Sequence, residues 1–445
     1  MTCWGGNNNG QLGDGTTAFS RTLQLIPDIT NAQTISLGAD YSCVLLTDGK
    51  VSCWGKNDDG QLGDGTTIQR TTPVEVSGIT TATSIAMAYE HSCALIAGSK
   101  VNCWGNNLYG KLGDGTTSSS TTPVDVSGIT TATSIALGYY HTCALLIDGK
   151  IKCWGMNNKG QLGDGTTADR STPAEVSGIT SATSVALGSA HSCALLADAK
   201  LMCWGTNFFT TDDTTDASFT APVEISGFSL SLTSCVSGVG TQMNPSTPVT
   251  TQGIECVRYC FQCTSGDTSC TAEEISSGAV LPAYTAVASS TVTQMRANPT
   301  VYKNLFACSS NDCNTRDDDS CSQPSPLPPP FSIDAGTSHT CIVQTGKVKC
   351  WGSNSNGQLG DGTTTTRSTT VEVSGITTAR SVAIGAHESC AVLSDGKVKC
   401  WGDNENGGLG DGTTTDRSTP VDVSGITTAT QVAVSYDHSC ALLSD

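Results

Sequence analysis

The tripeptide Cys-Trp-Gly occurs seven times in this chain, and its spacing constrains the fold more than any other feature of the sequence. The first five copies stand 50 residues apart, and so do the last two. Self-similarity at one long period indicates a repeat architecture, in which each unit packs against its neighbours. The cysteines of the seven copies are Cys3, Cys53, Cys103, Cys153, Cys203, Cys350 and Cys400.

Each repeat contains four short apolar stretches separated by Gly, Asp, Ser and Thr. In the repeat around Cys103 they fall at 85–87, 92–96, 101–104 and 123–126. Four short strands per repeat, with no segment of helical periodicity, are typical of a β-propeller blade. Seven copies therefore predict an all-β fold, a seven-bladed β-propeller.

The length of the chain predicts how the ring closes. Seven 50-residue units and the 97-residue excess between Cys203 and Cys350 require 447 residues, and the chain has 445. The two missing residues belong to a hairpin turn between the strand at Ala441–Ser444 and the strand at Met1–Trp4. We therefore expect strands from both termini to share one blade within a single chain, because an open blade exposes an edge that aggregates.

One composite motif recurs in register along about 340 residues. It resembles the regulator-of-chromosome-condensation repeat family, and this resemblance implies a seven-bladed propeller. One copy departs from the motif, because Phe208-Phe209-Thr210-Thr211 follows Trp204-Gly205. The residues that carry the resemblance in one repeat are His141-Thr142-Cys143-Ala144-Leu145, Asp148-Gly149-Lys150, Trp154-Gly155, Asn157 and Gly160-Gln161-Leu162-Gly163.

Loop length predicts disulfides between the second and third strands of each blade. A three-residue turn at Thr47-Asp48-Gly49 makes residues 46 and 50 partners, so Cys43 faces Cys53 directly. In the sixth repeat the cysteines are one residue closer and the turn is one residue shorter. Buried free thiols are the alternative. The same rule pairs Cys93 with Cys103, Cys143 with Cys153, Cys193 with Cys203, Cys341 with Cys350, Cys390 with Cys400 and Cys3 with Cys440.

The repeat disappears between the two propeller segments, which we place at 1–227 and 331–445, with 1–28 closing the ring. We expect a cysteine-rich inserted module at 228–322 and a stiff proline-rich linker at 323–330. The module resembles the three-finger family of urokinase-receptor domains and toxins in Tyr259-Cys260-Phe261-Gln262-Cys263 and in the segment from Cys308 to Asn314. Bridges are expected at Cys263, Cys270, Cys308 and Cys313, and the pairing of Cys235, Cys256, Cys260 and Cys321 stays open.

Charge and cysteine content restrict the partners and the compartment. The formal net charge of −18 repels phosphate backbones, so we expect no nucleic-acid partner, and no apolar run is long enough for membrane insertion. Regular cross-strand disulfides favour an extracellular or cell-surface location.

We expect a mature form whose leader is not in the sequence. With no unblocked Asn-x-Ser/Thr site, any glycan is expected on Ser or Thr.

Several residue patterns suggest chemistry, and each has a structural alternative. Five histidines recur two residues before a cysteine, which could form a catalytic His-Cys dyad or a pair of zinc ligands. A catalytic or metal site is not expected in five copies, so we interpret the histidines as structural hydrogen-bonding residues. We interpret the Trp residues as core and Asn57-Asp58-Asp59-Gly60 as a turn rather than a calcium loop. A zinc site at Cys260 and Cys263 is the weaker alternative in the insert. We expect no cofactor and no enzyme. The histidines are His91, His141, His191, His339 and His438.

Three functions remain open at this stage. The leading hypothesis is a structural propeller that self-assembles into an extracellular filament or coat. The alternative is a secreted protein-binding or inhibitor propeller, since the resembled family includes a secreted inhibitor of β-lactamases. The third function is the family's founding role, guanine nucleotide exchange on the GTPase Ran, which the acidic charge and the cysteines disfavour.

Overall fold

The computed structural model describes residues 1–27, 29–198, 200–206, 218–225, 259–262, 280–283, 305–308, 321–322 and 331–444. The chain divides into two compact units. The first combines Met1–Ser229 with Phe331–Asp445, and the second is Leu230–Pro330.

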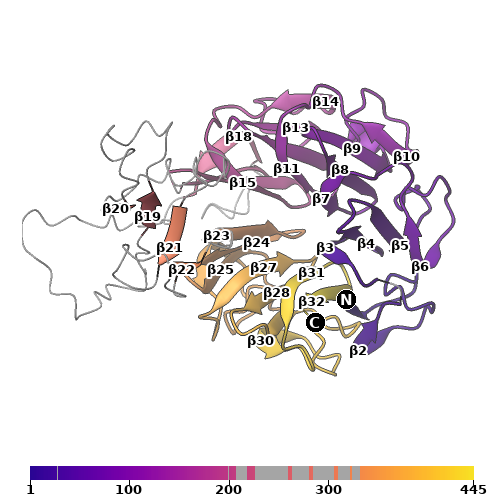
Figure 1. The fold of residues 1–445 in the computed structure, drawn as a ribbon, viewed down its shortest axis with the longest axis vertical. Helices are drawn as coiled ribbons and strands as arrows, with labels where there is room; N and C mark the ends of the chain where they lie inside the picture. Colours follow the sequence, from indigo (N-terminus) through magenta and orange to yellow (C-terminus); the bar gives the residue numbers. More distant parts are fainter. Residues whose placement is uncertain are drawn as a thin grey trace, which may run out of the picture. The chain divides into compact units, whose positions relative to one another are not determined.

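The first unit is a ring of seven four-stranded antiparallel sheets (Figure 1). The prediction of an all-β, seven-bladed propeller is confirmed. We number the blades in chain order, so that blade I is β3–β6 and blade VII is the sheet formed by strands from both termini. Within the described residues the helical structure is the single turn η1 (Leu108–Gly110), and no helix there has the length and apolar content needed to cross a bilayer.

The first four blades repeat one pattern of strands. Blade I contains β3 (Ala32–Leu37), β4 (Tyr41–Leu46), β5 (Val51–Gly55) and β6 (Arg70–Glu75). Blade II contains β7 (Ala82–Met87), β8 (His91–Ile96), β9 (Lys100–Gly105) and β10 (Ser120–Asp125). Blade III contains β11 (Ala132–Leu137), β12 (His141–Leu146), β13 (Ile151–Gly155) and β14 (Arg170–Glu175). Blade IV contains β15 (Ala182–Leu187), β16 (His191–Leu196), β17 (Leu201–Thr206) and β18 (Ser218–Glu224).

The remaining blades follow the interruption of the repeat. Blade V contains β23 (Phe331–Ala335), β24 (His339–Gln344), β25 (Lys347–Gly352) and β26 (Arg367–Glu372). Blade VI contains β27 (Ala379–Ile384), β28 (Glu388–Leu393), β29 (Val398–Gly402) and β30 (Arg417–Asp422). Blade VII contains β31 (Ala429–Val434), β32 (His438–Leu443), β1 (Thr2–Gly5) and β2 (Ser20–Leu25).

Blade VII closes the ring as the length arithmetic predicts. Its strand order is β2-β1-β32-β31, so the first and last strands of the chain pair with each other. The two ends of the chain lie close together in Figure 1. Cys3 is the register partner of Cys440, and the two form a disulfide within one chain.

The hairpin register also follows from loop length. In blade I the backbone N–H of Leu46 donates to the carbonyl of Lys50 at 2.9 Å, and Gly49 has a φ of +81°. Cys43 therefore lies opposite Cys53, with their Cα atoms 4.1 Å apart, as the close pairs of an antiparallel ladder lie. In blade V the two-residue turn pairs Gln344 with Lys347. The disulfides are Cys3–Cys440, Cys43–Cys53, Cys93–Cys103, Cys143–Cys153, Cys193–Cys203, Cys341–Cys350 and Cys390–Cys400.

The hydrophobic core consists of layers between neighbouring blades. The Trp side chains of the Cys-Trp-Gly copies are essentially unexposed and lie in these layers. Trp104 of blade II, for example, packs with Leu62 and Val76, which follow strands of blade I. The interpretation of the tryptophans as core is confirmed. Apolar burial therefore holds six pairs of adjacent blades together in the described residues: I–II, II–III, III–IV, V–VI, VI–VII and VII–I.

The second unit interrupts the chain between β18 and β23. Its described residues form a four-stranded antiparallel sheet in the order β20-β19-β21-β22. The cysteines predicted to bridge there, Cys263, Cys270 and Cys313, lie outside the described residues, as does the Cys308 side chain, and the three-finger resemblance and zinc alternative stay predictions. The strands are β19 (Tyr259–Gln262), β20 (Val280–Ala283), β21 (Leu305–Cys308) and β22 (Cys321–Ser322).

The closing disulfide should stabilise the ring far more than a hairpin disulfide. Cys3 and Cys440 are separated by 437 residues, whereas Cys143 and Cys153 are separated by 10. Loop-closure entropy grows with the logarithm of loop length, so Cys3→Ala/Cys440→Ala should cost ~3 kcal/mol more unfolding free energy than Cys143→Ala/Cys153→Ala. Denaturant unfolding of both variants measures the difference. Equal losses, or covalent ladders of the unmodified protein on non-reducing gels, contradict closure within one chain.

Candidate functional site

The recurring histidines link five of the seven blades to the next blade, and Tyr41 and Glu388 stand at this position in blades I and VI. The Nε2 atom of His91 lies 2.9 Å from Oγ1 of Thr142, and that hydroxyl donates to the backbone carbonyl of Lys111 at 2.9 Å. Because the hydroxyl has one proton, the imidazole Nε2–H is the donor in the first bond. We name this arrangement the interblade belt. The same link joins His141 to Ser192, His191 to Thr340, His339 to Ser389 and His438 to Ser42.

Burial lowers the pKa of four belt histidines, which are His91, His141, His191 and His339. Desolvation lowers the pKa of His141 to about 3 and that of His191 to about 4. The neighbouring cysteine Cys143 is in a disulfide, so it supplies no thiolate for a catalytic dyad. In the part of the chain that the structure describes, no three His, Cys, Asp or Glu side chains are grouped to hold a metal ion. The structural interpretation of these histidines is confirmed.

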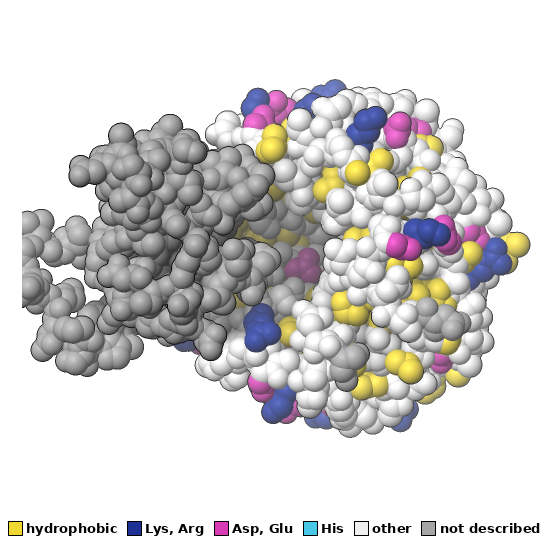
Figure 2. Space-filling view, in the orientation of Figure 1, with side chains coloured by type: hydrophobic (Ala, Val, Ile, Leu, Met, Phe, Trp, Pro, Cys, Tyr) yellow, Lys and Arg dark blue, Asp and Glu magenta, His cyan; other side chains and the backbone are white. Residues whose placement is uncertain are grey.

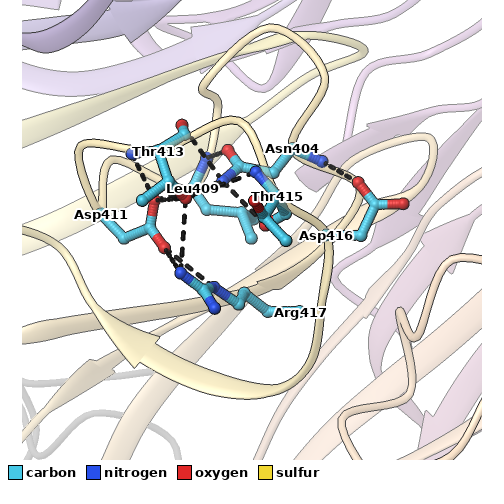
Figure 3. Close-up of polar contacts among 7 residues, drawn as sticks. All are labelled: Asn404, Leu409, Asp411, Thr413, Thr415, Asp416 and Arg417. Atoms are coloured by element: carbon cyan, nitrogen blue, oxygen red, sulfur yellow. Dashed lines mark hydrogen bonds and ion pairs between the residues drawn. The ribbon is translucent and has the colours of Figure 1, made fainter.

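The Gly/Asp-rich loops that follow the third strands of the blades, outside blade IV, are closed by their own side chains, as Figure 3 shows for blade VI. In blade VI, Asn404 Nδ2 donates to Oδ1 of Asp411 at 3.2 Å and to the backbone carbonyl of Thr413. Arg417 Nη2 lies 2.7 Å from the other carboxylate oxygen, Oδ2. Although burial raises it, the pKa of Asp411 is lowered overall by hydrogen bonds from Thr413 and Arg417. The carboxylate is occupied by intramolecular donors, as the turn interpretation predicts.

The turns between the first and second strands are the places where the blades differ. The segment Ser-Gly-Ile-Thr-Thr-Ala-Thr-Ser-Ile-Ala is identical at 77–86 and 127–136, yet the two residues before each belt position differ in all seven blades. We call the end of the ring that carries these turns the turn face. The seven dipeptides are Ala39-Asp40, Tyr89-Glu90, Tyr139-Tyr140, Ser189-Ala190, Thr337-Ser338, Ala386-His387 and Tyr436-Asp437.

Tyrosines from these turns meet over the central channel. The rings of Tyr89 and Tyr139 stack with centroids 4.9 Å apart, and Tyr436 contacts Tyr139 at 5.8 Å. Tyr436 belongs to blade VII and Tyr139 to blade III, so the contact crosses the channel mouth. The hydroxyl of Tyr139 also lies 3.3 Å from Oγ1 of Thr337 in blade V. The aromatic cluster therefore caps a channel that small turn residues line below it over about 90 Å³.

A second cavity opens beside this cluster. It has a volume of about 310 Å³ and combines turn residues with residues of the blade VI loop. We call it the mouth pocket. Figure 2 shows the ring hollowed near its middle, with an acidic side chain inside the hollow. The mouth pocket is lined by Ala39, Asp40, Tyr89, His387, Asp403, Glu405, Asn406, Tyr436 and Asp437.

The mouth pocket is strongly acidic. Four of its lining residues are carboxylates, and the lining group that can carry positive charge is His387. Burial raises the pKa of Asp40, and the neighbouring carboxylate of Asp437 raises it further. The repulsion between the carboxylates of Asp40 and Asp437 is thus part of the electrostatics of the mouth pocket.

Two substitutions in the repeat lie next to the turn face. In blade II, Lys111 replaces the glutamine that stands at Gln61 in the loop of blade I. Lys111 is unexposed, and burial lowers its pKa to about 8. Its Nζ lies 5.5 Å from the ring centroid of Tyr140. Glu388 replaces the belt histidine in blade VI, where it is 1% exposed. Burial raises its pKa well above the ordinary value, and Asp403 and Asp437 raise it further.

Sequence reasoning missed both the tyrosine cluster and the mouth pocket. A signal was present, since five of the nine tyrosines lie in this cluster and the seven turn dipeptides differ. The predicted site residues, the cysteines and histidines, hold the scaffold together instead. They position the turn face without contributing reactive groups to it.

Comparisons with known proteins identify the fold and a family. A family model described as the RCC1-like domain matches residues 1–243. Models described as the regulator of chromosome condensation repeat match residues 332–358, 379–407 and 395–442. No curated protein matches the chain in sequence.

Solved structures agree with the family models. Prp20p from Saccharomyces cerevisiae, described with its binding properties to Gsp1p and histones, is 19% identical, with a TM-score of 0.65 over 99% of this chain and 90% of that one. Human WBSCR16 is 17% identical, with a TM-score of 0.67 over 99% of this chain and 98% of its own. Yeast RCC1 (Prp20) bound to Kap60 is 19% identical, with a TM-score of 0.67 over 100% and 89%. At this identity the likeness establishes the fold alone.

The neutral belt histidines make stability depend on pH. The pKa of His141 lies near 3 in the folded state and near 6.5 when the chain unfolds, so the unfolded state binds the proton first as pH falls. Between pH 7 and pH 5 this residue should remove about 2 kcal/mol of unfolding free energy. The unfolding free energy of His141→Gln should lack that part of the pH dependence. Above about pH 7.5 it should differ from that of the unmodified protein by a constant amount. Denaturant unfolding across pH measures both, and an unchanged slope contradicts the neutral belt.

Proposed function

Because the chain belongs to the RCC1-like domain family, we propose that it is a non-enzymatic propeller that binds a protein partner through the turn face. The observation that carries this proposal is the divergence of the turns within a nearly uniform set of repeats. Exposure alone does not explain it, since the Gly-Asp-Gly-Thr-Thr loops are more exposed than most of these turns and yet recur unchanged in six of the seven repeats. The residues of the turn face therefore vary between repeats more than the rest of the repeat sequence does.

The chemistry of the divergent turns suits protein recognition. Tyr residues supply large contact area at low conformational-entropy cost and are enriched in the energetic centres of protein interfaces. The cluster places Tyr89, Tyr139 and Tyr436 together, and Tyr436 keeps 38% of its surface exposed. Relatives of the same fold, such as Prp20p, are described as binding proteins. Both observations support a protein ligand over a small substrate.

We place this protein outside the cell or at its surface. The ring carries seven disulfides, and such bonds persist in oxidising compartments. The same feature, with the acidic charge, weighs against nucleotide exchange on an intracellular GTPase. For a protein in this location, we also propose O-linked glycans on the Ser/Thr-rich loops.

Self-assembly is the second candidate function. The loops closed by Asp411 and Arg417 in blade VI recur in blades I, III and V, with the pairs Asp64–Arg70, Asp164–Arg170 and Asp361–Arg367. A repeated polar rim offers the same surface to several neighbours at once, which suits lateral packing into a filament or coat. The net charge of −18 opposes it, because copies of this chain repel one another.

The extracellular proposal predicts a fully oxidised ring in native material. Alkylation of native material that is unfolded in denaturant without reductant should label none of the fourteen propeller cysteines, and alkylation after reduction should label all of them. Intact mass with peptide mapping measures the labelling. Labelling of Cys43 or Cys53 before reduction argues for a reducing compartment.

The binding proposal predicts that partner capture depends on the turn face. Tyr139→Ser/Tyr436→Ser in the full chain should weaken capture of an extracellular partner about tenfold or more, since both side chains lie in the aromatic centre. Ile147→Ser is the matched control, because Ile147 is 74% exposed at a hairpin on the opposite end of the ring. Cross-linking and affinity measurement with both variants test this. Equal weakening overturns the turn-face assignment, and filaments of the purified protein that both variants retain favour self-assembly.

A further inference from the structure

We propose that the mouth pocket binds the ammonium or guanidinium group of a lysine or arginine side chain of a protein partner. This inference rests on the proposed function, because it names the chemistry by which the turn face recognises its partner. Its basis is the charge, the aromatic wall and the unsatisfied polar atoms of the pocket.

The charge of the pocket selects a cation. Asp40, Asp403, Glu405 and Asp437 line one cavity of about 310 Å³, and His387 is the lining residue that can offset them. Asp403 is partly occupied, since Oδ2 accepts from Asn356 and Oδ1 from the backbone N–H of Glu405. Burial and Asp437 raise the pKa of Asp40 by more than His438 and Lys56, which pairs with Glu90 at 3.8 Å, lower it. Carboxylates enclosed by low-dielectric walls concentrate negative potential, and a bound cation relieves their repulsion.

The wall of the pocket adds a surface for the alkyl stem and for the charge. Tyr89 and Tyr436 both line the pocket, with ring centroids 6.0 Å apart and planes inclined at 55°. A cation near the face of a tyrosine ring gains an electrostatic attraction that strengthens as water is excluded. The methylene groups of a lysine or arginine stem pack on the same rings.

Polar atoms in and behind the pocket lack donors. Oδ1 of Asp437 is buried without a hydrogen-bond partner among the described residues, and the nearest basic atom, Nδ1 of His438, is 3.8 Å away. The Oε2 atom of Glu388 is also buried without a partner there. Oδ1 of Asp437 is therefore available to accept a hydrogen bond from a group that enters the pocket.

Glu388 lies directly behind the pocket because of a paired substitution. In blade I, Gln61 accepts a hydrogen bond from the backbone N–H of Asp59, two residues earlier. Blade VI has Gly408 in place of this glutamine, and the carboxyl group of Glu388 fills the space beside this glycine that a side chain would occupy. The carboxylate thus occupies the glutamine's place, beneath Asn406, the counterpart of Asp59 and a lining residue of the pocket. The substitution places a titratable carboxyl group where an amide stands elsewhere.

The size of the pocket favours one side chain as the occupant. About 310 Å³ is at the lower end of the range of ligand pockets, which fits a single extended side chain rather than a cofactor. A free polyamine carries the same alkylammonium chemistry. The neighbouring tyrosine cluster extends the contact surface beyond the pocket, which favours a side chain presented by a protein.

The test uses the full chain and three probes: the peptide acetyl-Gly-Lys-Gly-amide, the same peptide with an acetylated lysine, and spermidine. The lysine peptide should bind, and more weakly at high salt, whereas the acetylated peptide should bind about tenfold more weakly or not at all. Asp40→Asn/Asp437→Asn should weaken binding of the lysine peptide about tenfold or more. Calorimetry and NMR titration measure the affinities.

Matched variants separate recognition from general charge or misfolding. Asp48→Asn/Asp148→Asn removes two charges from hairpins on the opposite end of the ring and should leave peptide binding unchanged. Tyr436→Phe keeps the ring and should retain affinity, whereas Tyr436→Leu should reduce it. Circular dichroism confirms that each variant is folded.

The outcomes distinguish this inference from the proposed function. Equal binding of the lysine and acetylated peptides, or no effect of the pocket substitutions, overturns the cation pocket. Binding of spermidine without the lysine peptide overturns a protein side chain as its occupant. If the tyrosine substitutions abolish partner capture while Asp40→Asn/Asp437→Asn does not, the proposed function stands and the pocket assignment fails. If the pocket binds the peptide but partner capture ignores the turn face, the proposed function fails alone.

Discussion

Pairing of the first strand with the last is the interaction on which the propeller depends. β1 pairs with β32 over Thr2–Gly5, with the Cys3–Cys440 disulfide inside that ladder and its sulfur-bearing residues unexposed. The same strand also supplies Trp4, which packs into the layer between blades VI and VII with Val398, Leu409 and Val423. Losing this strand therefore opens a blade, uncovers a layer of core and exposes two strand edges at once. No other short segment serves two blades while also closing the ring.

Backbone carbonyls of the loop residues join the blades in a second way. The carbonyl of Gln61 accepts from Trp104 Nε1 and from Ser92 Oγ, both in the next blade. A backbone acceptor tolerates a change of its own side chain, which explains how Lys111 and Gly408 stand at the glutamine position without breaking the link. The side chain at this position is free to vary while the ring stays intact. At Gly408 that freedom admits Glu388, whose buried carboxylate is costly for folding, so stability alone does not account for it.

Most of the scaffold follows from the sequence, because each feature depends on local spacing. Loop length determines the hairpin register, so the cysteine partners are readable without a structure, and recurrence identifies the belt histidines as structural. The tyrosine cluster is different. Tyr139 and Tyr436 are 297 residues apart and belong to blades on opposite sides of the channel, so their contact depends on how all seven turns converge. The mouth pocket is harder still to predict from the sequence. Its lining combines residues of the turns with residues of the blade VI loop, in which Gly408 replaces the glutamine.

The distribution of the divergent turns around the ring bears on how a partner binds. Ser189-Ala190 of blade IV and Thr337-Ser338 of blade V are small and carry neither aromatic nor charged groups; Ser189 Oγ donates to the carbonyl of Thr337 at 2.7 Å. Blades II, III and VII carry the contacting tyrosines, and blades I, VI and VII carry the carboxylates of the mouth pocket. Within a ring of near-identical repeats, this asymmetry gives the turn face one aromatic side and one acidic side. A partner that engages both is held in a single rotational setting, which a symmetric seven-fold surface does not specify.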